Sequence, residues 1–294
     1  MRHRASRVLV VANPAAGLRR GRDAGAAAAA GAARAGAAVE LHRTTRPGEA
    51  SEVGAAAARA GFDLVLAAGG DGTAHEVAQG LAGSAVALGV APAGTMNLLA
   101  RVLRLPLDPE RAAWALVSGF RRVTMLPGSA SGRLFLVTAG AGFDAWVLRA
   151  LLRDVRGKIG FHDYVRGAIS GIASFPFPEL TATADAGRFL GHTIVVGRAE
   201  LYGGFLRPTP HVRVDEGPLE LCALSGGRVR LAATLPYLWS GAHGGRPGVA
   251  LVRCVHASLT ADRPDVPYQL DGELAGVLPV TIERTARRLV LARL

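Results

Sequence analysis

The chain contains very little lysine and very little cysteine. Lys158 is the only lysine among 34 basic residues, and Cys222 and Cys254 are the only cysteines in 294 residues. Two cysteines without metal-ligand spacing exclude a disulfide-rich secreted scaffold and a cysteine-based zinc site. This usage indicates a reducing compartment, and we expect a cytoplasmic protein.

The signatures of several enzyme classes are missing as well. No GxxxxGK[ST] sequence is present, which excludes a conventional P-loop, and no GxSxG serine elbow occurs. His75 and Glu76 begin an HExxH pattern, but Gln79 stands at its last position, so a zincin site is excluded. Gly140 and Gly142 lack the third glycine of a dinucleotide fingerprint.

No segment has the pattern of a membrane span. Residues 77–100 carry no charge, but Gly83, Pro92 and Gly94 divide them into a helix end, a strand, a loop and a new helix. The N-terminus is basic, but its apolar run at 8–12 is too short for a signal peptide. We therefore expect neither a transmembrane helix nor a cleaved leader.

Apolar and positively charged residues, by contrast, are abundant. Hydrophobic residues make up 50% of the chain, enough at this length to fill the cores of two domains. The formal net charge is +11, which favours anionic partners such as nucleotides and phospholipid headgroups. Nucleic acid is not an expected partner, because no recognition motif or aromatic-interleaved basic stretch occurs.

The most informative stretch is the uncharged run at 64–68 and the glycine-rich sequence that follows it. The run predicts a buried parallel strand, and the glycines allow the backbone to approach a ligand closely. Thr73 is placed to cap a helix beginning at Ala74, whose N-terminus would face an anion. Asp71 is placed to hold a cation beside that anion. An ordinary strand-to-helix turn would have the same composition.

Around this stretch, strands and helices alternate through the first part of the chain. Strands are predicted at 7–12, 39–42, 63–68 and 86–90, with helices at 18–35, 44–60, 97–105 and 109–118. Such alternation predicts a parallel sheet covered by helices, with ligands at the carboxyl ends of the strands. Three loop motifs fall at such ends, at 13–17, 69–73 and 92–97.

The sequence pattern changes near residue 123, after which the predicted helices and strands become shorter. Strands are predicted at 134–138, 180–184, 193–197, 211–214, 219–224 and 289–292, and helices at 145–153 and 164–173. A β-rich second domain is therefore expected.

Taken in order, these loop motifs together with Gly140-Ala141-Gly142-Phe143-Asp144 and Asp271-Gly272-Glu273 resemble the diacylglycerol kinase catalytic-domain family. That family includes bacterial lipid kinases and sphingosine kinases. The resemblance implies an N-terminal α/β nucleotide-binding domain with an NAD-kinase/phosphofructokinase-like parallel sheet, followed by a β-rich sandwich domain. The first would span 1–122 and regain a strand from 286–294, and the second would span 123–285.

The function implied is transfer of the ATP γ-phosphoryl group to a lipid hydroxyl, with Mg²⁺ as cofactor. Diacylglycerol is the expected acceptor and phosphatidic acid the product. The enzyme would be peripherally associated with an anionic membrane surface, and a homodimer is left open. One alternative is an NAD-kinase-like phosphotransferase acting on a soluble substrate. Another is a non-catalytic lipid- or nucleotide-binding relative, against which the second pair of carboxylates argues.

The same resemblance assigns roles to individual residues. The nucleotide-binding set is Asn13, Pro14, Gly17, Thr44, Gly69, Gly70, Asp71, Gly72, Thr73, Gly94, Thr95 and Asn97. Thr44 is equally well explained as a helix cap. For the carboxylate that accepts the hydroxyl proton, we rank Glu273 first, Asp271 second and Asp71 third, with Asp215 as a further member of the network. A surface turn would also explain the Asp-Gly-Glu sequence.

A metal site is implied near Asp215. Mg²⁺ would be bound by Asp71 at the nucleotide and, at a structural site, by the Arg213 carbonyl, the Glu216 side chain and the Pro218 carbonyl. The sequence departs from the family's Asp-Asp-Gly-x-Leu-Asp pattern here, because Glu216 replaces the second aspartate and Pro218 follows the glycine. A plain acidic turn is the alternative.

Overall fold

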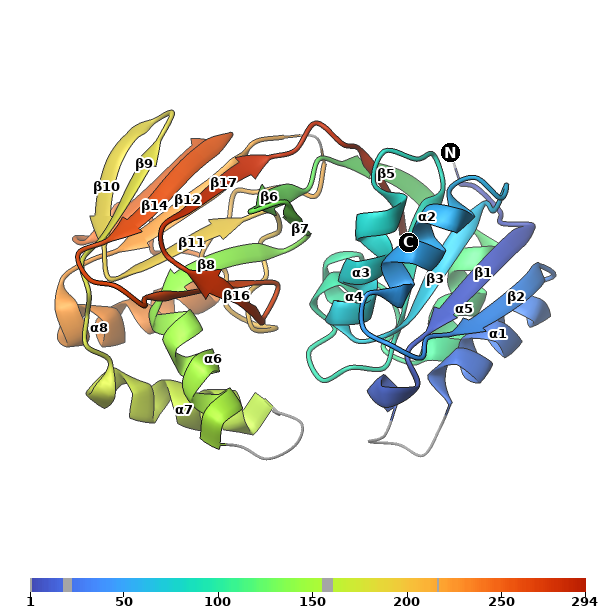
Figure 1. Cartoon of the computed structure of the whole chain (residues 1–294), viewed down its shortest axis with the longest axis horizontal. Coiled ribbons are helices and arrows are strands. Elements are labelled where there is room, and N and C mark those ends of the chain that lie inside the picture. Colours follow the sequence, from blue (N-terminus) through green and yellow to red (C-terminus); the bar gives the residue numbers. More distant parts are fainter. Residues whose placement is uncertain (1, 18–22, 155–160, 216) are drawn as a thin grey trace. The chain divides into compact units, whose positions relative to one another are not determined.

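The computed structural model describes residues 2–17, 23–154, 161–215 and 217–294. The chain forms two compact units. The first comprises Met1–Pro127, Val214–Glu216 and Thr285–Leu294, and the second comprises Gly128–Arg213 and Gly217–Arg284. Figure 1 shows the parallel sheet of the first unit and the antiparallel sheets of the second.

The first unit is built on a six-stranded sheet with the order β2-β1-β3-β4-β18-β5. Its strands are β1 (Arg7–Ala12), β2 (Ala38–Arg43), β3 (Leu64–Gly69), β4 (Ala87–Pro92), β5 (Arg121–Met125) and β18 (Leu289–Arg293). All neighbours pair in parallel except β5, which runs antiparallel to β18. Every residue of β3 and β4 is buried, which explains their uninterrupted apolar sequences. Because β5 joins this sheet, the first unit extends to Pro127, beyond the expected end at residue 122.

Helices cover both faces of this sheet. They are η1 (Pro14–Gly17), α1 (Ala24–Arg34), α2 (Glu49–Ala57), α3 (Asp71–Leu81), α4 (Leu98–Val102) and α5 (Pro109–Ser118). α1 packs against α5, and α2 packs against α3. Asp23 accepts hydrogen bonds from Gly25 N and Ala26 N, which fixes the start of α1. The predicted α/β domain with a parallel sheet is therefore confirmed.

The second unit is a sandwich of two six-stranded sheets with the orders β10-β9-β14-β17-β6-β7 and β13-β12-β11-β8-β15-β16. The strands are β6 (Gly128–Ala130), β7 (Arg133–Phe135), β8 (Thr138–Gly142), β9 (Leu180–Ala184), β10 (Gly187–Gly191), β11 (Thr193–Gly197), β12 (Leu219–Leu224), β13 (Val249–Cys254), β14 (His256–Ala261), β15 (Pro267–Leu270), β16 (Glu273–Val277) and β17 (Val280–Arg284). One apolar core, including Ala182 and Ile282 from one sheet and Ile194 and Leu221 from the other, lies between them.

Among its described residues, this unit contains the helices α6 (Phe143–Asp154), α7 (Phe161–Ser174) and α8 (Gly227–Ser240). A second apolar cluster joins Phe143 and Phe175 to Leu231 of α8. The sequence pattern does not predict α8, because Gly226 caps it, Gly227 is its first residue and Pro236 lies inside it. The strand predicted at 211–214 is wrong, because these residues form no strand in the structure. The backbone N–H of His211 donates instead to the carboxylate of Glu220.

Candidate functional site

The loops after β1, β3 and β4 meet at one edge of the parallel sheet. The strand order reverses between β1 and β3, so this edge is the topological switch point where ligands bind in open α/β sheets. Register places Ala12 beside Ala68, and Gly69 beside Pro92. The backbone N–H of Asn13 donates to the carbonyl of Ala68 over 3.1 Å. The structure thus brings together the three predicted loop motifs.

The loops after β3 and β4 touch through two glycines. A Cβ added to Gly94 would lie 2.6 Å from the Cα of Gly70, closer than real Cβ contacts. Ala93 N also donates to Gly69 O over 2.8 Å. A Cβ at Gly69 would meet the Thr73 hydroxyl at 2.3 Å. Glycine is required at Gly94 because the backbones of the two loops approach each other directly, and at Gly69 because the Thr73 side chain occupies the space of a Cβ.

Asn97 shapes the loop that contains Thr95. Its side-chain amide forms two hydrogen bonds of 2.9 Å with Gly94, accepting from the backbone N–H and donating to the carbonyl. Its φ of 49° is left-handed, which asparagine tolerates better than most residues. The predicted nucleotide ligand Asn97 therefore has a clear role in fixing loop geometry.

Asp71 links the glycine-rich loop to the start of α4. Its two carboxylate oxygens accept from Leu98 N at 3.0 Å and Leu99 N at 3.1 Å. A carboxylate at these N–H groups also offsets the positive end of the helix. α3 itself begins at Asp71, with Gly70 at the N-cap position, so the predicted capping of a later helix start by Thr73 is wrong. Thr73 is buried within the first turn instead.

The first loop is compact. Asn13 accepts from Ala15 N over 2.9 Å, which folds the chain directly into η1 from Pro14 to Gly17. The backbone N–H groups that follow β1 therefore lie at the same edge of the sheet as the N–H groups of the glycine-rich loop.

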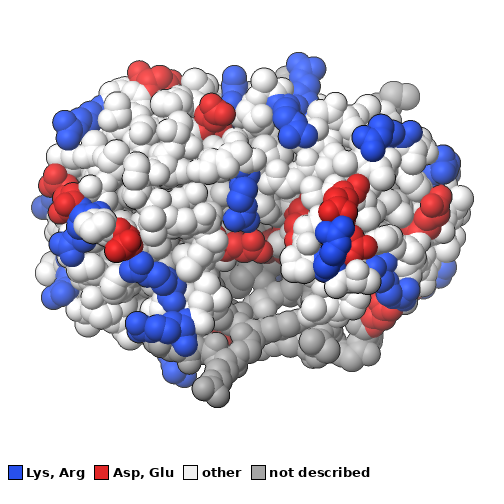
Figure 2. All heavy atoms as spheres, in the orientation of Figure 1, with Lys and Arg blue, Asp and Glu red and all other residues white. Residues whose placement is uncertain are grey.

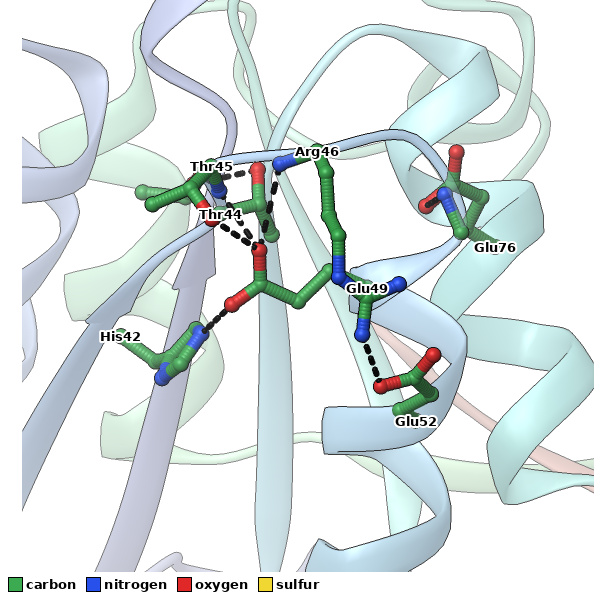
Figure 3. Close-up of polar contacts among 9 residues, drawn as sticks. His42, Thr44, Thr45, Arg46, Glu49, Glu52 and Glu76 are labelled. Atoms are coloured by element: carbon green, nitrogen blue, oxygen red, sulfur yellow. Dashed lines mark hydrogen bonds and ion pairs between the residues drawn. The ribbon is translucent and has the colours of Figure 1, made fainter.

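Thr44 lies at the end of β2 beside a network centred on Glu49 (Figure 3). The Glu49 carboxylate accepts from Thr45 N at 2.6 Å and Thr45 Oγ1 at 2.9 Å, and it contacts His42 Nε2 at 2.8 Å. These contacts, led by the Thr45 N–H, lower the pKa of Glu49 from 4.5 to about 2. Thr44 itself donates from N and Oγ1 to the Ala12 carbonyl. It therefore ties β2 to β1 and does not cap α2.

In the second unit, the Asp271-Gly272-Glu273 turn joins β15 to β16. Asp271 and Gly272 have φ values of 49° and 87°, which fits a tight turn with glycine at its centre. The Asp271 carboxylate accepts from Leu136 N, Val137 N and Thr138 N at 2.7–2.9 Å. Asp271 is thus engaged with the backbone before β8, which makes it a poor acceptor for a substrate proton.

Glu273 has a different environment. Its side chain is 54% exposed, and it pairs with the Arg133 guanidinium at 3.4 Å. A carboxylate that is solvent-accessible and loosely paired can receive a proton from a substrate. Asp271 therefore anchors the turn to the backbone at 136–138, while the Glu273 side chain lies exposed at the surface.

Sequence reasoning did not identify Asp144 and Gln269 as site residues. Asp144 Oδ2 accepts from Gln269 Nε2 at 3.1 Å and from Tyr202 OH at 3.0 Å, and Gln269 Oε1 accepts from Gly272 N at 2.6 Å. Burial raises the pKa of Asp144. A Cβ at Gly140 would collide with Asp144 Oδ2, so the glycine motif makes room for this contact. These residues hold the Asp-Gly-Glu turn.

The predicted structural metal site is only partly described. Glu216 lies outside the described residues, and Asp215 is half-buried. The Pro218 carbonyl accepts from the Arg198 guanidinium at 3.3 Å. Among the residues that the structure describes, no group of three or more His, Cys, Asp or Glu side chains is arranged to hold a metal ion.

The surface carries positive charge in many places. Figure 2 shows basic side chains spread over the displayed face, with acidic side chains between them. No helix in the described part of the chain is long and apolar enough to cross a membrane.

Two family models together match most of the chain. Residues 7–126 match the family model described as diacylglycerol kinase catalytic domain, and residues 137–293 match the YegS C-terminal NAD kinase beta sandwich-like domain. A Bacillus subtilis (strain 168) protein named diacylglycerol kinase is 29% identical over 81% of this chain and 80% of its own length. A Pseudomonas aeruginosa (strain UCBPP-PA14) protein named as a YegS-like lipid kinase is 31% identical over 78% of this chain and 76% of its own length.

Solved structures agree in fold. A crystal structure of a diacylglycerol kinase from Bacillus anthracis str. Sterne superposes with a TM-score of 0.70 at 19% identity, covering 99% of this chain and 98% of that chain. Another structure from the same strain reaches a TM-score of 0.77 at 22% identity, with the same coverage. With both domain models matched in order and a relative above 30% identity, the chain belongs to the diacylglycerol kinase catalytic-domain family of lipid kinases.

Proposed function

We propose that this protein is an ATP-dependent lipid kinase that transfers the γ-phosphoryl group to the free hydroxyl of diacylglycerol, giving phosphatidic acid and ADP. The observation that carries the nucleotide part is the close approach of Gly70 and Gly94, in the loops after β3 and β4, next to the switch point between β1 and β3. Backbone N–H groups at such a point can cradle phosphate oxygens. The lipid acceptor is inferred from the names of the relatives.

Different residues of the chain would bind the nucleotide and position its binding loops. The loops at 13–17, 69–73 and 94–97 would bind the nucleotide, and Asp71 would keep the last two in register through α4. Mg²⁺, when bound with ATP, supplies positive charge that offsets the phosphates. Asp71 remains the carboxylate of this edge best placed to lie beside such an ion, in addition to its role at α4.

Proton removal is assigned to Glu273. As the acceptor hydroxyl oxygen bonds to the γ-phosphorus, its proton moves to the Glu273 carboxylate, and the bond between the γ-phosphorus and the bridging oxygen breaks to release ADP. Asp271 keeps its rank below Glu273, because three backbone N–H groups donate to its carboxylate. Asp215 stays a candidate member of the network.

The test is transfer of radiolabelled γ-phosphate from ATP to a panel containing diacylglycerol, other hydroxyl lipids and NAD. We expect labelled phosphatidic acid and no labelled NADP. Glu273→Gln should lower turnover roughly 10²-fold or more, the scale of a positioned general base, while ATP affinity changes only a few-fold. Glu283→Gln, at an exposed position on β17, is the matched control and should remain fully active.

Two results would contradict the proposal. Labelling of NAD without any labelled lipid would assign a soluble substrate. Full activity of Glu273→Gln would remove Glu273 as the base while leaving the kinase assignment intact.

A further inference from the structure

Helix α8 of the second unit carries apolar residues on both of its faces (Figure 1). Its inner face packs into the apolar cluster around Phe175 through Leu231 and Leu238. The residues on the opposite face recur at helical spacing, and all of them are exposed and uncharged: Val229, Ala232, Ala233, Pro236 and Trp239. We call these five residues the outer stripe. The solvent-facing side of a helix in a globular protein is normally polar or charged, so the outer stripe is unusual.

Two side chains of the outer stripe are large. Val229 in the first turn of α8 is 84% exposed, and Trp239 in the last turn is 66% exposed. The Trp239 ring lies 5.6 Å from the ring of the half-buried Phe205, which belongs to the segment after β11. Exposed apolar side chains gathered in this way mark a binding surface, and tryptophan is enriched where proteins meet the interface of a bilayer.

Basic side chains border the outer stripe. Successive residues lie about 100° apart around a helix, so Arg228 and Arg230 flank Val229 on its two sides. The Arg246 guanidinium lies 3.3 Å from the centre of the Tyr237 ring, on the second half of α8. Residues 221–261 include four arginines and no aspartate or glutamate. The surroundings of the outer stripe are therefore positively charged.

Glu200 is an acidic side chain close to this surface, but it is paired. Arg207 N donates to the Leu238 carbonyl over 2.7 Å, which places Arg207 beside the last turn of α8. The Arg207 guanidinium lies 3.4 Å from the Glu200 carboxylate. Because this pair is formally neutral, it does not cancel the charge of the other arginines.

The basic border decides which partner fits the outer stripe. A second copy of this chain, meeting the same face, would bring two sets of arginines together, and like charges at an interface repel. The headgroup region of an anionic bilayer accepts apolar side chains and attracts the arginines beside them.

We propose that the outer stripe of α8 docks the protein on anionic phospholipid bilayers, with Val229 and Trp239 at the boundary between headgroups and acyl chains. The arginines of the border lie at the lipid phosphates. This goes beyond the proposed function, which names a lipid acceptor but no part of the chain that meets the bilayer. The proposal rests on that function only for the identity of the acceptor, since docking itself needs no ATP.

The first test measures whether the stripe enters the bilayer. Cys222 and Cys254 are buried, so an environment-sensitive thiol dye should label Val229→Cys selectively. With vesicles of phosphatidylcholine and phosphatidylglycerol, we expect the dye emission to shift to the blue. Val255→Cys is the matched control, because it is exposed and follows the end of β13 opposite to Val249, which packs near α8. The absence of a shift at Val229, or an equal shift at Val255, would overturn the proposal.

The second test removes the apolar side chains. Trp239→Ala should weaken affinity for these vesicles roughly 10-fold, because a large aromatic side chain no longer leaves water. Val229→Glu, at the more exposed position, should weaken it as well. Trp114→Ala, at an exposed tryptophan of α5, is the matched control and should leave affinity unchanged. Unchanged affinity in folded Trp239→Ala and Val229→Glu variants would overturn the proposal.

The third test separates a docking face from net charge alone. The double variant Arg228→Gln/Arg230→Gln should lose roughly 10- to 30-fold in affinity at low salt, since each basic residue near the surface contributes. Arg121→Gln/Arg188→Gln has the same net charge with both substitutions at exposed strand positions, and should lose much less. Equal losses in the two double variants would contradict a defined docking face.

Kinase assays distinguish failure of this proposal from failure of the proposed function. Trp239→Ala should phosphorylate diacylglycerol in vesicles poorly and water-soluble short-chain diacylglycerol normally. If the unaltered chain phosphorylates neither form, the proposed function is wrong, whereas the vesicle-binding results still decide the docking face. A dimer that Trp239→Ala dissociates, with vesicle affinity unchanged, would assign the outer stripe to a second copy of the chain and overturn the proposal.

Discussion

Asp271 and Glu273 are two residues apart in one turn, yet their surroundings favour different roles. Asp271 accepts three backbone N–H groups, whereas Glu273 is more than half exposed. A carboxylate that already accepts three hydrogen bonds stabilises the backbone that donates them. An exposed one remains available to a substrate.

We therefore expect Asp271→Asn to destabilise the protein. An amide NH₂ cannot accept a hydrogen bond, so at least one of the three N–H groups would lose its partner, at a cost of about 1–3 kcal/mol. Thermal unfolding should show a lower midpoint for Asp271→Asn and an unchanged one for Glu273→Gln. Equal midpoints for Asp271→Asn and the unaltered chain would refute the anchoring role.

Glu49 gives a prediction about pH. Its folded-state pKa of about 2 lies below its ordinary value of 4.5, so the ionised form stabilises the fold above that value, and the benefit is lost as pH falls toward 2. Glu49→Gln should be less stable than the unaltered chain at pH 7, and this difference should narrow between pH 4.5 and pH 3. Urea unfolding at several pH values measures it.

The control for this experiment is Glu52→Gln. Glu52 pairs with Arg46, and both side chains are exposed, so its removal should change stability little at any pH. A difference between Glu49→Gln and the unaltered chain that stays constant from pH 7 to pH 3 would show that the carboxylate charge is not responsible.

At the scale of elements, sequence patterns predict best where one local rule decides the structure. β3 and β4 are apolar throughout, and that alone identifies them as buried strands. α8 is not predicted because its proline and the two glycines at its start are locally unfavourable for a helix, while packing of Leu231 and Leu238 stabilises it. Local propensity loses to tertiary packing in such a case.

The candidate site, too, is predictable from the sequence only in part. The glycine-rich loop could be found from its residue types, which are tied to turns and phosphate binding, whereas the Asp-Gly-Glu turn is identified as part of a site only through the family resemblance. The bond from Asp71 to α4 spans 27 positions, and Gln269 and Asp144 are 125 positions apart. No spacing rule connects residues so distant, so their roles emerge only from the fold.

The contact between the β3 and β4 loops gives the element-scale prediction. Gly94→Ala would place a Cβ 2.6 Å from Gly70 Cα, and overpacking of this kind costs about 1–3 kcal/mol. If that strain opposes the nucleotide-binding form of the loops, ATP affinity should fall roughly 5- to 150-fold. Equilibrium binding of a fluorescent ATP analogue measures the loss.

Gly119→Ala is the matched control in the same unit. Its added Cβ would have its nearest contact at 3.6 Å, with the flexible Arg2 side chain, so ATP affinity should not change. Unaltered affinity in a folded Gly94→Ala variant would mean that the two loops need not touch to bind nucleotide.

For the whole molecule, the two-unit architecture is predictable because the sequence changes from long alternating elements to short strands near residue 123. The exact boundary is not, since β5 pairs with β18, a strand from the far end of the chain. Composition also gives the net charge, but it cannot tell where the charge lies. On the face shown in Figure 2, basic side chains are spread over both units.

The net charge of +11 leads to a prediction about lipid surfaces, which the proposed function requires the protein to meet. Attraction to anionic headgroups acts over the Debye length, which falls from ~30 Å at 0.01 M salt to ~3 Å at 1 M. In co-sedimentation, we expect the protein to bind vesicles containing anionic phospholipid at low salt and to be released at high salt. Neutral vesicles are the control and should bind little at either salt concentration. Equal binding to neutral and anionic vesicles at every salt concentration would show that charge does not bring the protein to the lipid.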